Sequence, residues 1–74
     1  MYTVYWFRYP HGIEGEEMIC KYRDFDNLEK ALNFLKNRIK LISSLYWAGG
    51  DITDEEGKQL YSATDEGKLI EEKE

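Results

Sequence analysis

Cys20 and His11 are the side chains whose chemistry comes closest to nucleophilic catalysis, with a thiol as nucleophile and an imidazole as its base. Cys20 falls in the middle of a strand-like run, on the side that we assign to the core, where an apolar setting makes a thiol inert. His11 falls in a turn and has no neighbouring side chain suited to position it as an acid or a base. The sequence therefore predicts a protein that is not an enzyme.

The acidic stretch DITDEEG, residues 51–57, suggests a calcium loop at first sight. An EF-hand loop needs glycine at its sixth position and a bidentate carboxylate at its twelfth, and counting from Asp51 those positions hold Glu56 and Ser62. A single cysteine and a single histidine cannot form the ligand set of a structural zinc site. We expect no metal and no other cofactor.

The aromatic run YTVYWFRY, residues 2–9, is the first candidate binding surface. Side chains of a strand alternate between two faces, so with Val4 and Trp6 in the core Tyr5, Phe7 and Tyr9 lie on an open face. We expect side chains of the second strand to lie next to them. Two apolar residues beside the core-facing stripe of the helix, which form a hydrophobic shoulder, are expected to lie there as well. The predicted surface comprises Tyr5, Phe7, Tyr9, Ile19, Lys21, Arg23, Phe34 and Leu41. Exposed apolar patches of this kind usually mark interaction sites.

Two hairpins and one helix must position these residues. The β-branched and aromatic content of residues 2–9 predicts a first strand, and residues 17–25 predict a second, paired with it. Within the second strand the even-numbered positions are the more apolar, so we assign them to the core. These positions are Met18, Cys20 and Tyr22.

The helix is predicted from Asp26 onward, because Asp26 can cap its first turn and Glu29 completes a capping box. Apolar residues then recur at helical spacing on one stripe, at Leu28, Ala31, Leu32, Leu35, Ile39 and Ile42. A third strand is expected to end near Thr53 and a fourth to cover residues 58–63, with Gly57 in a left-handed turn position. The pair Gly49-Gly50 suggests a bulge or a close approach of two backbones.

This order predicts an α+β two-layer sandwich, β-β-α-β-β, with a mainly antiparallel four-stranded sheet and one helix packed on one face. Residues 1–64 would form a single domain, and residues 65–74 a charged C-terminal tail. No apolar run is long enough to span a bilayer and no signal peptide is visible at the start, so we expect a cytoplasmic protein.

Charge is unevenly distributed along the chain, whose formal net charge is −5. Residues 1–40 hold seven Lys and Arg against six Asp and Glu, whereas residues 41–74 hold three against nine. We expect the protein to bind another protein, or a second copy of itself, through the aromatic face. The alternative is an acidic inhibitor that occupies the basic groove of a nucleic-acid-handling enzyme with Asp51, Asp54, Glu55 and Glu56. Binding of single-stranded nucleic acid ranks third, because the net charge opposes it.

Overall fold

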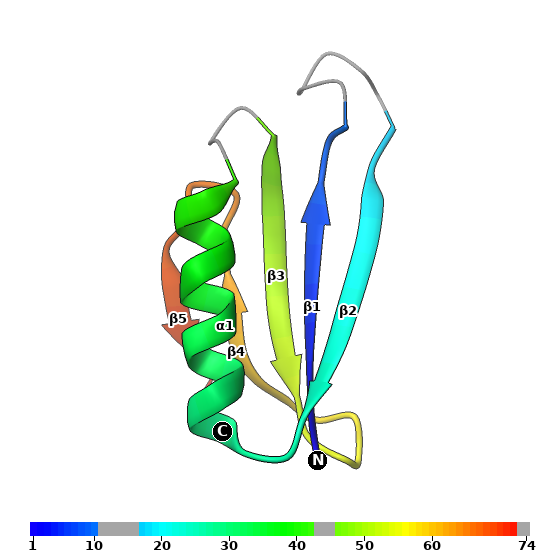
Figure 1. The fold of residues 1–74 in the computed structure, drawn as a ribbon, viewed down its shortest axis with the longest axis vertical. Helices are drawn as coiled ribbons and strands as arrows, with labels where there is room; N and C mark the ends of the chain where they lie inside the picture. The colour runs from blue at the N-terminus through cyan, green and yellow to red at the C-terminus, as the bar shows by residue number, and fades with distance from the viewer. Residues whose placement is uncertain (11–16, 43–45, 73–74) are drawn as a thin grey trace.

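The computed structural model describes residues 1–10, 17–42 and 46–72 of the 74-residue chain. Its elements follow the order β1 (Tyr2–Arg8), β2 (Ile19–Phe25), α1 (Leu28–Leu41), β3 (Trp47–Thr53), β4 (Gln59–Ala63) and β5 (Leu69–Glu71). The strands form one antiparallel sheet in the order β2-β1-β3-β4-β5, and α1 lies against one face of it (Figure 1). The α+β class and the single helix on one face are confirmed.

The predicted four-stranded sheet is wrong by one strand. β5 falls in the segment that we expected to be a charged tail, and it pairs with β4 through Ala63 and Leu69. Leu69 packs against the core from this strand. Gly67 has a φ of 84° in the tight turn before it, where the N–H of Gly67 donates to the carbonyl of Thr64. The two apolar residues Leu69 and Ile70 are enough to form a short strand among many charged residues, because the preceding turn has glycine where a left-handed conformation is needed.

The core lies between α1 and the helix-facing side of the sheet. Its fully buried side chains come from β1, α1 and β3, with Val4, Leu35 and Ile52 the largest. Trp6 and Trp47 are also buried, and the indole Nε1 of Trp47 donates to the carbonyl of Thr64 at 2.7 Å. The prediction that Val4 and Trp6 face the core is therefore confirmed.

The helix begins one residue later than the cap that we predicted. Asn27, not Asp26, is the N-cap, and its side-chain oxygen accepts from the backbone N–H groups of Glu29 and Lys30. Asp26 instead forms an ion pair with Lys30, one turn along the helix. Asparagine caps a helix as well as aspartate does, and the one that lies adjacent to the first helical residue takes the role.

The face assignment of β2 is wrong. β1 pairs with β2 so that Val4 lies opposite Arg23 and Trp6 opposite Lys21, and directly paired residues point to the same face of an antiparallel sheet. The odd-numbered residues of β2 therefore share the helix side, whereas Cys20 and Tyr22 lie on the open face opposite Phe7 and Tyr5. Met18, Cys20 and Tyr22 are all exposed and are not core residues.

The pair Gly49-Gly50 produces both features that we predicted for it. The register between β1 and β3 shifts between Phe7 and Arg8, where the chain passes from Gly49 to Trp47. Gly50 lies so close to β1 that a Cβ there would be 2.8 Å from the carbonyl oxygen of Tyr5.

Within the described residues, no helix is long and apolar enough to cross a membrane.

Candidate functional site

The structure divides the predicted interaction surface between the two faces of the sheet. Tyr5 and Phe7 lie on the open face as expected, but Ile19, Lys21 and Arg23 lie on the helix side. The predicted patch of aromatic side chains edged by Lys21 and Arg23 therefore does not exist as a single surface. Two separate surfaces replace it, one on each face.

The open face holds an aromatic group on β1 and β2. Tyr5 and Tyr22 are paired across the two strands, with ring centroids 6.1 Å apart, and Phe7 lies opposite Cys20 in the next pair of this face. Tyr22 is 67% exposed and Cys20 is also exposed, while Tyr5 and Phe7 are partly buried. Among the described segments, no helix packs on this side of the sheet (Figure 1).

Carboxylates complete the open face toward β4 and β5. The register aligns one row across all five strands, namely Tyr22, Tyr5, Asp51, Ser62 and Ile70. Asp51 accepts a hydrogen bond from Gln59 Nε2 at 2.6 Å, and Glu72 accepts one from the Ser62 hydroxyl at 2.7 Å. A third carboxylate, that of Asp24, accepts from the Thr3 hydroxyl at 2.6 Å. The described strand residues that point to this face include neither lysine nor arginine.

The pKa of Asp51 departs clearly from its ordinary value. Burial raises the pKa of Asp51 most, the hydrogen bond from Gln59 opposes the rise, and the charge of Glu72 adds to it. A raised pKa means that the folded chain disfavours the ionised carboxylate. A cation placed beside Asp51 by a binding partner would offset the cost of ionising this carboxyl group in the folded chain.

We expect Asp51→Asn to make the folded protein more stable at pH 7. A raised folded-state pKa gives a stability contribution that is complete below the unfolded pKa and is lost as the pH rises through the folded pKa. The advantage of asparagine should therefore shrink as the pH falls from 7 to about 3.5, where the aspartate of the wild type becomes protonated. Urea midpoints of both proteins at several pH values measure this, and a pH-independent difference would contradict it.

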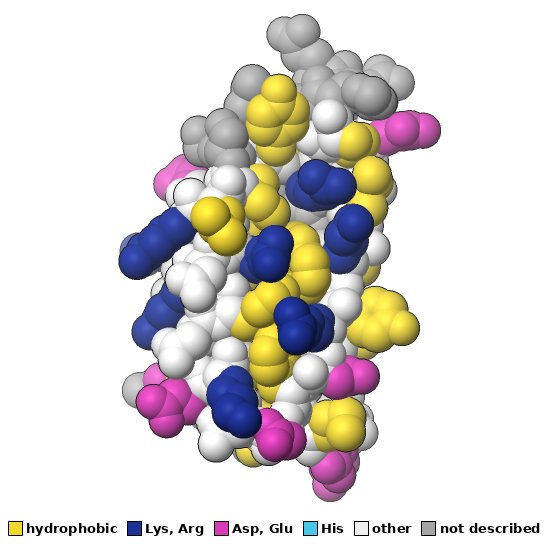
Figure 2. Space-filling model, in the orientation of Figure 1, with side chains coloured by type: hydrophobic (Ala, Val, Ile, Leu, Met, Phe, Trp, Pro, Cys, Tyr) yellow, Lys and Arg dark blue, Asp and Glu magenta, His cyan; other side chains and the backbone are white. Residues whose placement is uncertain are grey.

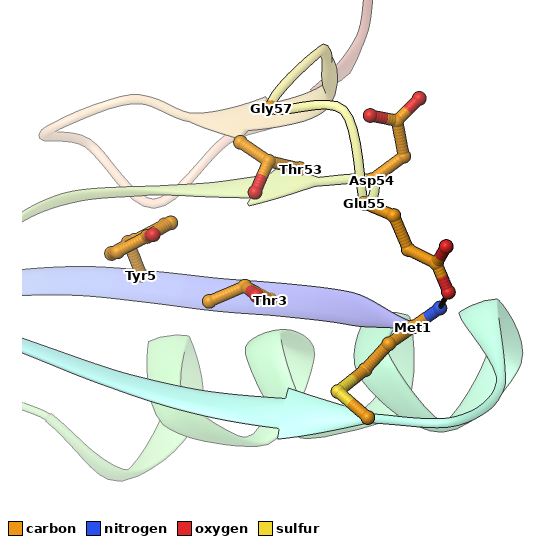
Figure 3. A pocket seen from close by; sticks show the side chains of 7 residues that line it. All are labelled: Met1, Thr3, Tyr5, Thr53, Asp54, Glu55 and Gly57. Atoms are coloured by element: carbon orange, nitrogen blue, oxygen red, sulfur yellow. Dashed lines mark hydrogen bonds and ion pairs between the residues drawn. The ribbon is translucent and has the colours of Figure 1, made fainter.

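A pocket of about 490 Å³ opens at the end of the open face, between the start of β1 and the β3–β4 turn (Figure 3). Thr3 and Tyr5 line it from β1 and Thr53 from β3, and the turn contributes Asp54 and Glu55. Glu55 forms an ion pair with the amino group of Met1, shown by the dashed line in Figure 3. A tyrosine ring in the same pocket as carboxylates suits the aliphatic stem and charged end of a lysine or arginine side chain.

The acidic hairpin residues do not form a uniform display. Asp54 Oδ1 accepts from the backbone N–H groups of Glu56 and Lys58, both at 2.9 Å, so this carboxylate holds the turn together. Asp51 lies on the open face, while Glu55 and Glu56 remain exposed at the turn. Within the described residues, no group of three or more His, Cys, Asp or Glu side chains could hold a metal ion.

The second surface is a groove of about 310 Å³ on the helix side, along the uncovered edge of the sheet. Trp6 and Phe34 form its aromatic floor, and Phe34 contacts both Trp6 and Phe25 in a row of three rings, each pair with ring centroids 5.1 Å apart. Guanidinium groups cover this row: Arg38 lies 4.7 Å from the Phe34 centroid, and Arg23 lies 5.5 Å from it. We call this site the arginine groove; Arg8, Lys21, Tyr22 and Ile42 also line it, so Tyr22 borders both surfaces.

The remaining predicted residues have other positions. Phe34 belongs to the floor of the arginine groove, whereas Leu41 is 73% exposed at the end of α1, so the two do not form one hydrophobic shoulder. Tyr9 follows β1, and its N–H donates to the carbonyl of Tyr46. His11 lies outside the described residues.

Sequence reasoning missed Arg8 and Arg38, although a signal for both was present. Arg8 follows Val4 and Trp6 on the same face of its strand, and Arg38 follows Phe34 at helical spacing.

Comparison of the chain with protein-family models, with characterised proteins and with solved structures found no match.

Proposed function

We propose that this chain is a non-catalytic binding module that holds a partner protein against the open face of its sheet. One observation supports this most strongly: the uncovered face combines aromatic side chains with carboxylates that have no cation beside them among the described strand residues. Soluble proteins keep such apolar surface small unless another molecule covers it. Tyrosine is also among the residues that contribute most to protein interfaces.

The charges on this face favour a partner with basic side chains. Asp24, Asp51 and Glu72 accept hydrogen bonds from neutral donors, so none of these hydrogen bonds brings a cation to the carboxylate. Because burial disfavours the ionised form of Asp51 and raises its pKa, a lysine or arginine of the partner placed beside it would offset that cost. The adjoining pocket is lined by Tyr5, Asp54 and Glu55, and a basic side chain of the partner that entered it would compete with the amino group of Met1 for Glu55.

A second copy of the chain fits this face less well. A symmetric dimer would place the same patch on both sides, so carboxylates would meet carboxylates without lysine or arginine between them. Like charges brought together in an interface oppose association. We therefore assign the face to a different, basic protein.

Tyr5→Ser should weaken binding of the partner at least about tenfold, because it removes a central aromatic contact without creating a cavity in the core. The full chain, immobilised through a C-terminal tag, is used to capture proteins from the source organism. Each captured protein is purified, and its dissociation constant is measured for the wild type and the variant. Affinity should also fall as salt is added, since carboxylates contribute to recognition.

Two controls make this test specific. Lys21→Met alters the arginine groove on the opposite side and should leave partner affinity unchanged. Cys20, the one cysteine of the chain, is exposed beside Phe7, so a partner on this face should slow its reaction with a thiol reagent. If the thiol is instead protected by raising the concentration of the chain alone, the face binds a second copy and our assignment is wrong.

A further inference from the structure

All three arginines of the chain, Arg8, Arg23 and Arg38, line one groove, together with Lys21. They come from β1, β2 and α1, which are distant in sequence. Figure 2 shows cationic side chains gathered around a strip of hydrophobic ones on this side of the molecule. The protein as a whole has a net charge of −5, so this concentration of cations is specific to the groove.

The guanidinium groups are held in place by stacking on aromatic rings. Arg38 lies over Trp6 and Phe34, at 5.6 and 4.7 Å from the ring centroids, and Arg23 lies over Phe34 and Phe25. Such stacking fixes the plane of a guanidinium group and leaves the hydrogen-bond donors along its edges free. The groove is therefore arranged before any ligand binds.

These cations have no acidic counterpart in the described part of the chain. The ion pairs described there involve Met1 with Glu55 and Lys30 with Asp26, and the groove contains no aspartate or glutamate. The Nε atoms of Arg8 and Arg38 are buried and lack a hydrogen-bond acceptor. Four neighbouring positive charges repel one another, and a buried charged donor without an acceptor is unfavourable. Both features point to a missing anion.

We propose that the arginine groove binds the phosphate group of a small phosphorylated molecule. A phosphate carries about two negative charges near pH 7 and offers three acceptor oxygens. Arginine pairs with it through two parallel N–H donors, and Lys21 adds a further charge. Binding would relieve the repulsion among the four cations. It would also supply acceptors for the N–H donors of the arginines, and both effects favour the complex.

The dimensions of the groove favour a small ligand over a nucleic-acid strand. Its volume of about 310 Å³ is near the lower end for small-molecule sites. Single-strand binders stack successive bases on exposed rings, but Trp6 is only 8% exposed and arginines lie over Phe34. The acidic remainder of the molecule would also repel a chain of phosphates.

The test is a titration of the isotope-labelled full chain with phenyl phosphate, followed through the side-chain Nε–H resonances of its arginines. Three such resonances exist, one for each arginine, and single substitutions assign them. We expect those of Arg8 and Arg38 to shift at millimolar phenyl phosphate. Benzoate has the same ring with one carboxylate, so it should shift them far less.

Two variants test the proposal through affinity. Arg38→Met keeps an aliphatic stem over Trp6 and Phe34 and should weaken phenyl phosphate binding roughly tenfold or more. Lys21→Met changes an exposed side chain, leaves the fold intact and should weaken binding about threefold. Lys36→Met removes the same charge from the exposed side of α1, outside the groove, and should change nothing.

Several outcomes would overturn the proposal. Unmoved arginine resonances would mean that the groove binds no phosphate, and equal shifts with benzoate would mean that any anion is attracted. Binding of an eight-nucleotide single strand of thymidine much more tightly than phenyl phosphate would make the ligand a nucleic acid. Tyr5 does not line the groove, although its ring partner Tyr22 does, so Tyr5→Ser should change phenyl phosphate affinity less than Lys21→Met, and the two tests can fail separately.

Discussion

Leu35→Ala is expected to lower the free energy of unfolding by about 3 kcal/mol. Leu35 is fully buried in the middle of α1 and belongs to the core with Val4 and Ile52 of the sheet. Truncation removes three buried carbons and leaves a cavity that the surrounding strands can fill only partly. Because a single core in a 74-residue chain supplies only a few kcal/mol of net stability, this variant should be largely unfolded near 37 °C.

Leu41→Ala is the matched control, since it makes the same change on the same helix. Leu41 is 73% exposed, so its truncation should alter the free energy of unfolding by less than about 0.5 kcal/mol. Urea unfolding followed by tryptophan fluorescence measures both variants, because Trp6 and Trp47 are buried in the fold. Equal destabilisation by the two would mean that α1 does not pack on the sheet as described.

The helix was predictable because a stripe of leucine and isoleucine at helical spacing has a single interpretation. The alternation in β1 predicts which residues share a face, but aromatic residues occupy both faces, so the sequence alone does not decide which face is buried. β2 carries apolar and charged residues on both of its faces, so a count of apolar side chains could not decide between them. Only pairing with β1 fixes the register, and that information is not local.

Arginine explains why the β2 prediction failed. Arg23 lies on the helix side, where its guanidinium stacks on Phe25 and Phe34, and a rule that places every charge in water does not anticipate this. β2 is an edge strand, so its basic side chains reach solvent although they point to the same side as α1. The same error hid the arginine groove, whose four cations come from three separate elements.

Gly50→Ala is expected to destabilise the fold by about 2 kcal/mol or more, through overpacking and not through an unfavourable backbone angle. A Cβ at this position would lie 2.8 Å from the carbonyl oxygen of Tyr5 and 3.0 Å from Leu35 Cδ1. Backbone of the central strand pair cannot yield without separating β1 from β3. The methyl group would therefore also displace Tyr5, which connects core packing to the open face.

Gly57→Ala tests the effect of an unfavourable backbone angle without any overpacking. Gly57 has a φ of 83° in the β3–β4 turn, and a Cβ there would meet nothing within 4 Å, so only the backbone conformation opposes the change. We expect a loss of about 1 kcal/mol, the usual penalty for a left-handed alanine. Urea midpoints should thus rank wild type above Gly57→Ala and that above Gly50→Ala. The reverse order would mean that β1 and β3 are not in close contact at Gly50, and that the position of Tyr5 does not depend on this glycine.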